Sequence, residues 1–265
     1  MNSGTSTADV IAGCEAWSHV AGSPVGVLVV HGFTGTPASV RGIAEAMALA
    51  GYDVELPRLP GHGTTVTDML ATEWSSWSGE VALAVERLTS RVSDVVAVGQ
   101  SMGATLVLRA ALDHPAISAL VCINPLTRVR DTETMAMLDD LLDDGLVVAP
   151  GEGSDIADPD SSDITYAGTP IAPLRSLLLH GVAPIADRYG EISVPLRLFT
   201  SRNDHVVDPG DSEHLAAVYG GPVEHTWLDR SYHVATRDYD RDLIVAESLA
   251  FVARVAGSHS RSVDQ

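Results

Sequence analysis

The sequence predicts an α/β fold in which a mostly parallel central sheet is covered by helices on both of its faces. Short apolar runs alternate along the chain with stretches of helical spacing, which is typical of repeated strand–helix units. The run VGVLVV, at Val25–Val30, is apolar without a break, as expected for a strand buried on both sides. A chain of 265 residues, 45% of them apolar, fits one large domain or two small ones with a substantial core.

The elements predicted for the first half of the chain alternate in type. After the first strand they are a helix at 38–50, a strand at 52–57, a helix at 74–92, a strand at 94–99, a helix at 102–113 and a strand at 118–124. The first of these helices ends at Gly51, a residue suited to a C-cap. The segment RLPGHGTTVTDMLATEW is too rich in Gly, Pro and Thr to be regular, so we expect a loop there.

The pattern changes after Pro125. Residues 127–190 hold the acidic cluster LDDLLDDG, the stretch APGEGSDIADPDSSD and the apolar helical piece PIAPLRSLLLHGVAPI, with no clear buried strand. We interpret 127–190 as a helical cap above the sheet, inserted into a core made of residues 1–126 and 191–265. The alternative is a disordered acidic surface loop. It is disfavoured because the Leu and Ile clusters at both ends of the segment are expected to pack over another part of the protein.

The sheet pattern resumes after this insertion. We expect strands at 194–201 and 223–228, helices at 209–219 and 240–256, and a frayed tail in the last residues, GSHSRSVDQ.

Composition excludes several classes of function. The net charge of −19 opposes binding to nucleic acid and to anionic bilayers, because both would be repelled. The N-terminus has neither a basic region nor a continuous apolar region, and no apolar run approaches the length of a membrane span, so we expect a soluble, cytoplasmic protein without stable membrane insertion. Cys14 and Cys122 form no metal or disulfide pattern, and Cys122 is expected to be a buried, inert thiol.

The stretch Gly99-Gln100-Ser101-Met102-Gly103 matches the pattern G-x-S-x-G between a predicted strand and a predicted helix. A nucleophile at the apex of such a tight turn has a strained backbone, and its neighbours two residues away must lack bulk. The turn also places the hydroxyl near the helix N-terminus, which favours negative charge. The alternative is that Ser101 merely caps the helix, as serine often does.

A serine nucleophile needs a base, and the base needs an orienting acid. In folds of this kind these residues follow the serine on loops after later strands. The loop RNDHVVDPGD offers Asp204 and Asp208; because Pro209 is a favoured first helical residue, Asp208 is expected to be an N-cap, which leaves Asp204 as the acid. His233, in the loop after the next strand, is expected to be the base.

The other histidines have structural interpretations. His205 is the rival base, but a side chain adjacent to Asp204 cannot readily face its carboxylate. His225 lies in a strand pattern, His214 on a helical face and His259 in the tail. No metal-binding spacing is present, so no metal is expected.

Acyl transfer also needs donors for the oxyanion of the tetrahedral intermediate. The backbone N–H of Met102, directly after the nucleophile, is one candidate. The loop HGFTGTP, after the first strand, offers the N–H of Phe33, while His31 is expected to brace this loop rather than react. A simple Gly/Pro turn is the alternative for this loop.

The segments VLVVHGFTGTP, LPRLPGHGTT, GQSMG, SRNDHVV and SYHVATRDYDRD, in this order and spacing, resemble the α/β-hydrolases grouped as bacterial monoacylglycerol lipases and small thermophilic carboxylesterases. The resemblance runs from about Val25 to Val255. It implies the α/β-hydrolase fold and a small helical cap between the sixth and seventh strands. It also implies Ser101 as nucleophile, Asp204 and His233 as its partners, and Phe33 and Met102 as the oxyanion hole.

The sequence also departs from the family. Gln100 replaces a more usual apolar residue, Ala104 stands where many relatives have a glycine, and the acidic stretch GEGSDIADPDSSD has no counterpart in the family pattern.

The resulting expectation is a serine ester hydrolase that acts on monoacylglycerols or simple acyl esters and needs neither metal nor organic cofactor. Phe33, Leu and Ile residues of the cap and the Met102 side chain are expected to line an apolar acyl site. A thioesterase with the same residues is one alternative, and a non-catalytic receptor for a hydrophobic small molecule is another. Chain-length preference and oligomeric state do not follow from the sequence.

Overall fold

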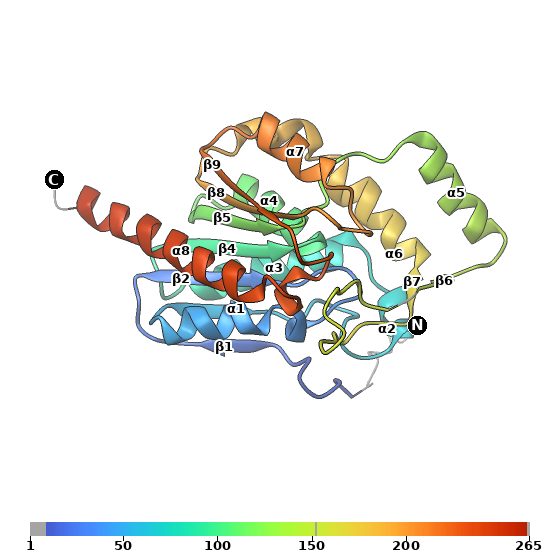
Figure 1. The fold of residues 1–265 in the computed structure, drawn as a ribbon, viewed down its shortest axis with the longest axis horizontal. Helices are drawn as coiled ribbons and strands as arrows, with labels where there is room; N and C mark the ends of the chain where they lie inside the picture. Colours follow the sequence, from blue (N-terminus) through green and yellow to red (C-terminus); the bar gives the residue numbers. More distant parts are fainter. Residues whose placement is uncertain (1–8, 152, 264–265) are drawn as a thin grey trace.

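A computed structural model of the chain, which describes residues 9–151 and 153–263, has a seven-stranded central sheet (Figure 1). The strand order is β1-β3-β2-β4-β5-β8-β9, and every neighbouring pair is parallel except β1 and β3. The predicted, mostly parallel sheet is confirmed. The strands are β1 Trp17–His19, β2 Val25–Val30, β3 Asp53–Leu56, β4 Asp94–Gln100, β5 Ile117–Ile123, β8 Leu196–Ser201 and β9 Val223–Leu228.

Helices cover both faces of this sheet (Figure 1). Val27 and Val29 of β2 pack with α1 and α8 on one face, whereas Leu28 and Val30 pack with α3 and α4 on the other. Successive strand residues point to opposite faces, so an unbroken apolar run is what a doubly covered strand requires. The helices are α1 Pro37–Leu49, α2 Val66–Leu70, α3 Trp74–Thr89, α4 Met102–Asp113, α5 Thr132–Asp143, α6 Ile171–Ser176, α7 Gly210–Val218 and α8 Arg241–Val263.

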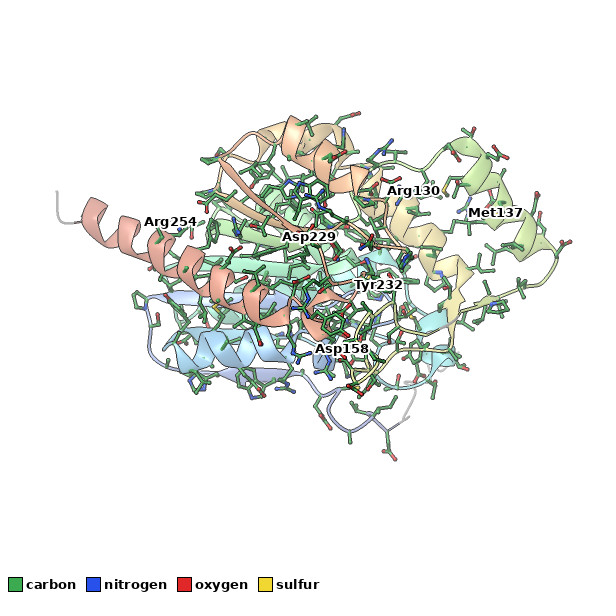
Figure 2. All side chains as sticks on the ribbon, viewed as in Figure 1. Arg130, Met137, Asp158, Asp229, Tyr232 and Arg254 are labelled. Atoms are coloured by element: carbon green, nitrogen blue, oxygen red, sulfur yellow. The ribbon has the colours of Figure 1, made fainter. Side chains whose placement is uncertain are left out.

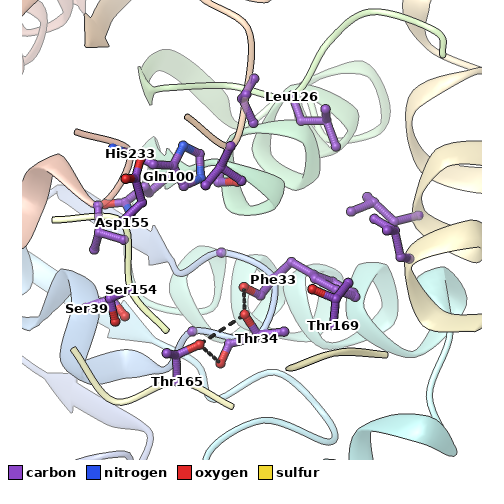
Figure 3. A pocket seen from close by; sticks show the side chains of 18 of the residues that line it. Phe33, Thr34, Ser39, Gln100, Leu126, Ser154, Asp155, Thr165, Thr169 and His233 are labelled. Carbon is purple, nitrogen blue, oxygen red and sulfur yellow. Dashed lines mark hydrogen bonds between the residues drawn. The ribbon is translucent and has the colours of Figure 1, made fainter. Parts of the chain in front are cut away.

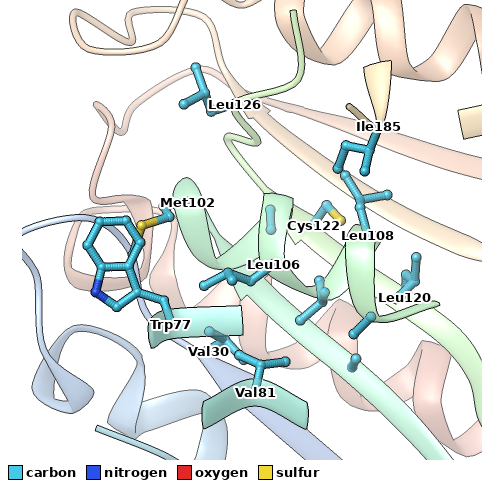
Figure 4. Close-up of a cluster of buried hydrophobic side chains, with 14 of the residues drawn as sticks. Val30, Trp77, Val81, Met102, Leu106, Leu108, Leu120, Cys122, Leu126 and Ile185 are labelled. Carbon is cyan, nitrogen blue, oxygen red and sulfur yellow. The ribbon is translucent and has the colours of Figure 1, made fainter. Parts of the chain in front are cut away.

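The apolar cluster on the α3 and α4 face holds α4 in place against the sheet (Figure 4). Trp77 and Met102 are fully buried there, and each such side chain contributes about 1.5–3 kcal/mol through burial. Cys122 is also fully buried in this cluster, and burial strongly raises the pKa of its thiol, as expected for an inert cysteine. The start of α4, which follows the predicted nucleophile, is therefore fixed by the core.

Between β5 and β8 the chain leaves the sheet. This part contains α5, an antiparallel pair formed by β6 Val148–Pro150 and β7 Gly168–Pro170, α6, a π-helix at Leu177–Val182 and a 3-10 helix at Ala186–Glu191. Residues 153–166 cross over the core as an irregular segment that is hydrogen-bonded along its length to core residues, and not as a disordered acidic loop.

Several elements differ from the sequence-based expectations. The edge strand β1, the short pair β6–β7 and the five-residue helix α2 were not predicted, because elements this short carry no measurable periodicity. The helix at 240–256 continues to Val263, through most of the predicted tail. The cap was expected between the sixth and seventh strands. In the described residues only β1 precedes β2, so the insertion follows β5, the fifth strand of the sheet in chain order.

The ends of the chain are only partly described. Residues 1–8, which belong to the segment judged not to be a signal peptide, and residues 264–265 of the predicted tail lie outside the described residues. None of the helices in the described ranges is both long enough and apolar enough to span a bilayer.

Candidate active site

Ser101 lies at the sharp turn between β4 and α4. Its backbone has φ 55° and ψ −121°, a left-handed conformation that costs a non-glycine residue about 1–3 kcal/mol. Ser101 stands at the N-cap position of α4, but in the described part of the chain its side chain accepts no hydrogen bond from the start of this helix. Its side chain faces a cavity instead.

The glycines on either side of Ser101 are required by close backbone approaches. A Cβ atom on Gly99 would overlap the carbonyl of Gly103, and one on Gly103 would lie only 2.6 Å from the carbonyl oxygen of His31. Gly32, in the loop after β2, packs against Ser101, because a Cβ there would stand 3.2 Å from the serine Cβ. The turn therefore requires glycine at 99 and 103, and the loop after β2 packs tightly against it at Gly32.

His233 and Asp204 meet through their side chains. His233 Nδ1 lies 2.7 Å from Asp204 Oδ2, and the two side chains are 8% and 2% exposed. A carboxylate only accepts, so Nδ1 carries the proton and Nε2 has its lone pair free to accept one. Asp204 Oδ1 accepts the backbone N–H groups of Val206 and Val207, each at 2.8 Å, which fixes the carboxylate. His233 and Ser101 line the same cavity.

The alternative candidates for the acid and the base have other hydrogen-bond partners. Asp208 was predicted to be the N-cap of α7, but this helix begins one residue later, at Gly210, and its N-cap is Pro209. Asp208 lies one residue before the cap, where its Oδ1 accepts the N–H of Gly210 at 2.6 Å. The imidazole of His205 pairs with Asp155 and not with its neighbour Asp204. His225 is hydrogen-bonded to Thr200 between two strands, and burial lowers its pKa.

The loop after β2 is braced by two neutral histidines. Leu59 donates its N–H to His31 Nε2 at 3.1 Å, so Nδ1 of this ring donates to the carbonyl of Gly32 at 3.0 Å. Burial, reinforced by His62, holds the pKa of His31 well below its usual value. Burial also lowers the pKa of His62 to about 4, and this ring contacts His31 and Phe33 edge-on.

This arrangement leaves two backbone donors beside the serine. Across the described residues, the N–H groups of Phe33 and Met102 have no hydrogen-bond acceptor within the protein. Both belong to segments that meet at the Ser101 turn, since Gly32 touches Ser101 and Met102 follows it. The side chain of Met102, however, lies in the core and does not line the cavity, contrary to our expectation, because the first turn of α4 directs it toward Trp77 (Figure 4).

Ser101 is one of the residues that line a cavity of about 400 Å³ (Figure 3). One part of its wall is polar and comes from the loop after β2, the first turn of α1 and the segment that crosses over the core; these residues are Thr34, Ser39, Asp155, Asp163 and Thr165. The rest is largely apolar and comes from Phe33, Leu126, Met137, Leu138, Leu174, Leu177, Leu178 and Val207. The insertion contributes leucines, as predicted, but none of its isoleucines.

Comparison with known proteins places this site in a family. A family model described as the alpha/beta hydrolase fold matches residues 26–162. The chain is 39% identical over 257 residues to the thermostable monoacylglycerol lipase of Bacillus sp. (strain H-257), which covers 94% of this chain and 98% of that protein. The chain belongs to the α/β-hydrolase family. The carboxylesterase of Bacillus subtilis (strain 168) is 24% identical to this α/β-hydrolase. The match covers 88% of the present chain and 94% of the esterase.

Solved structures agree with this assignment. A structure from work on the metagenome-derived lipolytic enzymes LipS and LipT matches the α/β-hydrolase with a TM-score of 0.86 and 37% identity, over 93% of this chain and 100% of the other. The monoacylglycerol lipase of Paleococcus ferrophilus, at 17% identity, has the same fold with a TM-score of 0.68 and covers 88% of this chain and 94% of its own.

The α/β-hydrolase also holds its histidine loop with side chains that sequence reasoning missed. Asn124, at the end of β5, donates from Nδ2 to the carbonyl of His233 at 2.8 Å and accepts the N–H of Ser201 at 2.7 Å. Asp240 Oδ2 accepts the N–H and Oγ–H of Ser231, while Asp238 Oδ2 accepts the N–H of Tyr232 at 2.8 Å. The segment SYHVATRDYD, already singled out for its resemblance to the family, contained both aspartates, but its residues gave no indication of these partners.

Proposed function

We propose that this α/β-hydrolase is a serine ester hydrolase that cleaves monoacylglycerols and simple carboxylic esters through an acyl-enzyme. The observation that carries this proposal is the buried Asp204–His233 pair, which shares a cavity with a serine in strained backbone geometry. The names of the relatives, a monoacylglycerol lipase and a carboxylesterase, support the same reaction class.

In the proposed reaction, Ser101 Oγ attacks the ester carbonyl carbon while His233 Nε2 takes the hydroxyl proton. Asp204 stabilises the imidazolium and keeps Nε2 directed at the cavity. The tetrahedral intermediate collapses when the alcohol leaves with the proton from His233. Water then attacks the acyl-enzyme by the same steps, with His233 as the base, and releases the carboxylic acid and the free serine.

The N–H groups of Phe33 and Met102 are the proposed oxyanion donors. They cost no reorganisation during the reaction because the braced loop after β2 and the start of α4 already hold them beside Ser101. Each such donor contributes about 3–4 kcal/mol to lowering the barrier.

The cavity wall supports an acyl ester with a hydroxyl-bearing alcohol. Leu138, Leu174 and Leu177 offer an apolar surface for an acyl chain, and we assign them to a cap formed by residues 127–190. At the polar part, Asp163 Oδ2 accepts the Ser39 hydroxyl at 2.7 Å, whereas Oδ1 is buried and lacks a hydrogen-bond partner among the described residues. A glycerol hydroxyl bound at this part of the wall would have the Asp163 carboxylate as a neighbouring acceptor.

The deciding experiment combines covalent labelling with a substrate panel. A fluorophosphonate is expected to modify Ser101, and turnover is expected on monoacylglycerols and on p-nitrophenyl esters of matched chain length. No adduct on the folded protein would leave a non-catalytic receptor as the function. Faster turnover of matched thioesters than of esters would identify a thioesterase.

A further inference from the structure

One carboxylate of the insertion binds both loops that carry the proposed acid and base. Asp155 Oδ2 accepts the backbone N–H of His233 at 3.0 Å and that of His205 at 3.1 Å. Its other oxygen, Oδ1, lies 2.8 Å from His205 Nδ1. The backbone carbonyl of Asp155 also accepts the N–H of Val234 at 3.0 Å. The residue therefore bridges the two loops through its side chain and its main chain.

The bridge runs alongside the Asp204–His233 hydrogen bond. His205 is the chain neighbour of Asp204, so Asp155 connects the backbones of the same two loops that Asp204 and His233 connect through their side chains. The Asp155 side chain is only 17% exposed and lines the cavity beside His233 (Figure 3). Hydrogen bonds to an ionised carboxylate are about twice as strong as neutral ones, so the link is strong enough to set the spacing of the loops.

The segment that carries Asp155 does not depend on this residue for its own position. Asp238 accepts the N–H of Ala157 at 2.7 Å and that of Asp158 at 3.0 Å, near Tyr232, whose N–H it also accepts (Figure 2). Farther along, Ser39 donates to Asp163 at 2.7 Å. Loss of the Asp155 side chain therefore removes the bridge and leaves the rest of the segment in place.

We infer that Asp155 is a positioning residue, which holds the His233 loop against the Asp204 loop so that the imidazole is correctly placed for Ser101; this inference rests on the proposed function. A displacement of about 1 Å in a catalytic group can cost on the order of 100-fold in rate. Because Asp155 belongs to the insertion and not to the core, the insertion supplies part of the geometry of the catalytic residues as well as a wall for the substrate.

The test compares Asp155→Ala with Asp155→Asn and with Asp160→Ala, an exposed aspartate of the same segment. With p-nitrophenyl acetate, which has a short acyl group, Asp155→Ala is expected to lower kcat about 10- to 100-fold and leave KM within about two-fold. The rate of fluorophosphonate labelling of Ser101 is expected to fall by the same factor. Asp155→Asn keeps one oxygen for the two backbone N–H groups and is expected to recover part of the loss, while Asp160→Ala behaves as wild type.

A purely structural or substrate-binding role would give other results. Equal kcat and labelling rates in Asp155→Ala and Asp160→Ala would overturn the inference, as would a rise in KM alone. If Asp155→Ala does not fold, the isosteric Asp155→Asn decides, and wild-type labelling of that variant overturns the inference. Labelling of wild-type Ser101 in the same experiment tests the proposed function independently, so the two failures are distinguishable.

Discussion

Asp204 and His233 form a 2.7 Å hydrogen bond between side chains that lie 29 positions apart in the sequence, and both are almost fully buried. The second oxygen of Asp204 is already bound to the N–H groups of Val206 and Val207, so the carboxylate cannot rotate away from the imidazole. A fixed acceptor of this kind selects the tautomer of His233 that can take a proton from a hydroxyl. The predictions below follow from this pair and its surroundings.

Replacement of Ser101 by Ala is expected to abolish turnover. The variant lacks the nucleophilic oxygen, and kcat on p-nitrophenyl esters is expected to fall at least about 10³-fold. The side chain makes no cap contact with α4 in the described residues, so the midpoint of thermal unfolding should stay close to that of wild type. Ester cleavage near the wild-type rate would rule out Ser101 as the nucleophile.

Asp204→Asn is expected to reduce kcat far more than Asp208→Asn. An amide at position 204 can favour the wrong tautomer of His233, which costs about 10³- to 10⁴-fold in comparable sites. Asp208 contacts the start of α7 and not the histidine, so its variant is expected to lose at most a few-fold. Steady-state kinetics of the pair on one substrate provides the comparison, and the reverse order would show that the acid had been misidentified.

Asp163→Asn is expected to change substrate selectivity more than overall catalysis. Burial raises the pKa of this carboxyl group, and Asp163 is one of the residues that line the polar part of the cavity. The ratio of kcat/KM for a monoacylglycerol to kcat/KM for the matched p-nitrophenyl ester should fall about ten-fold, equivalent to one charge-assisted hydrogen bond of about 1.4 kcal/mol. An unchanged ratio would place the alcohol elsewhere in the cavity.

Stability is expected to fall below neutral pH because His62 is buried as the neutral form. Its pKa drops from 6.5 to about 4 on folding, so the unfolded chain binds more protons between these values. The stabilisation is complete above pH 6.5 and is lost as the pH falls toward about 4. Between about pH 7 and about pH 5.5, His62 should account for about 1 kcal/mol of the change in unfolding free energy.

Urea unfolding of wild type and His62→Asn at both pH values isolates this effect. An asparagine amide can replace Nδ1 as the donor to the carbonyl of Pro60, which His62 Nδ1 contacts at 3.0 Å. The variant is expected to lose less stability on acidification than wild type, whatever its stability at neutral pH. Equal losses in the two proteins would mean that His62 is protonated in the folded state.

The sharp turn at Ser101, the proposed nucleophile, could be predicted from the sequence because its requirements are local. A left-handed serine between two glycines, after a buried strand and before a helix, is a property of consecutive residues. The preference for Asp204 over Asp208 rested on an N-cap role for Asp208, whereas the structure has Pro209 at the N-cap and Asp208 one residue before it, hydrogen-bonded to Gly210. The alternation of strands and helices predicted the central sheet for the same reason, as each element carries its own periodicity.

Only the tertiary structure showed which residues hold the loops of the proposed acid and base. Asp155 lies 78 positions from His233, and Asn124 lies 109 positions from it, in irregular segments without periodicity. At His233 their partners are a backbone N–H and a backbone carbonyl, groups that nearly all residues have, so no sequence pattern marks the contact. The sequence by itself determined the turn, the sheet and the order of the polar residues along the chain. The distances between loops were decided by folding, because packing of the core sets where strand ends and crossing segments meet.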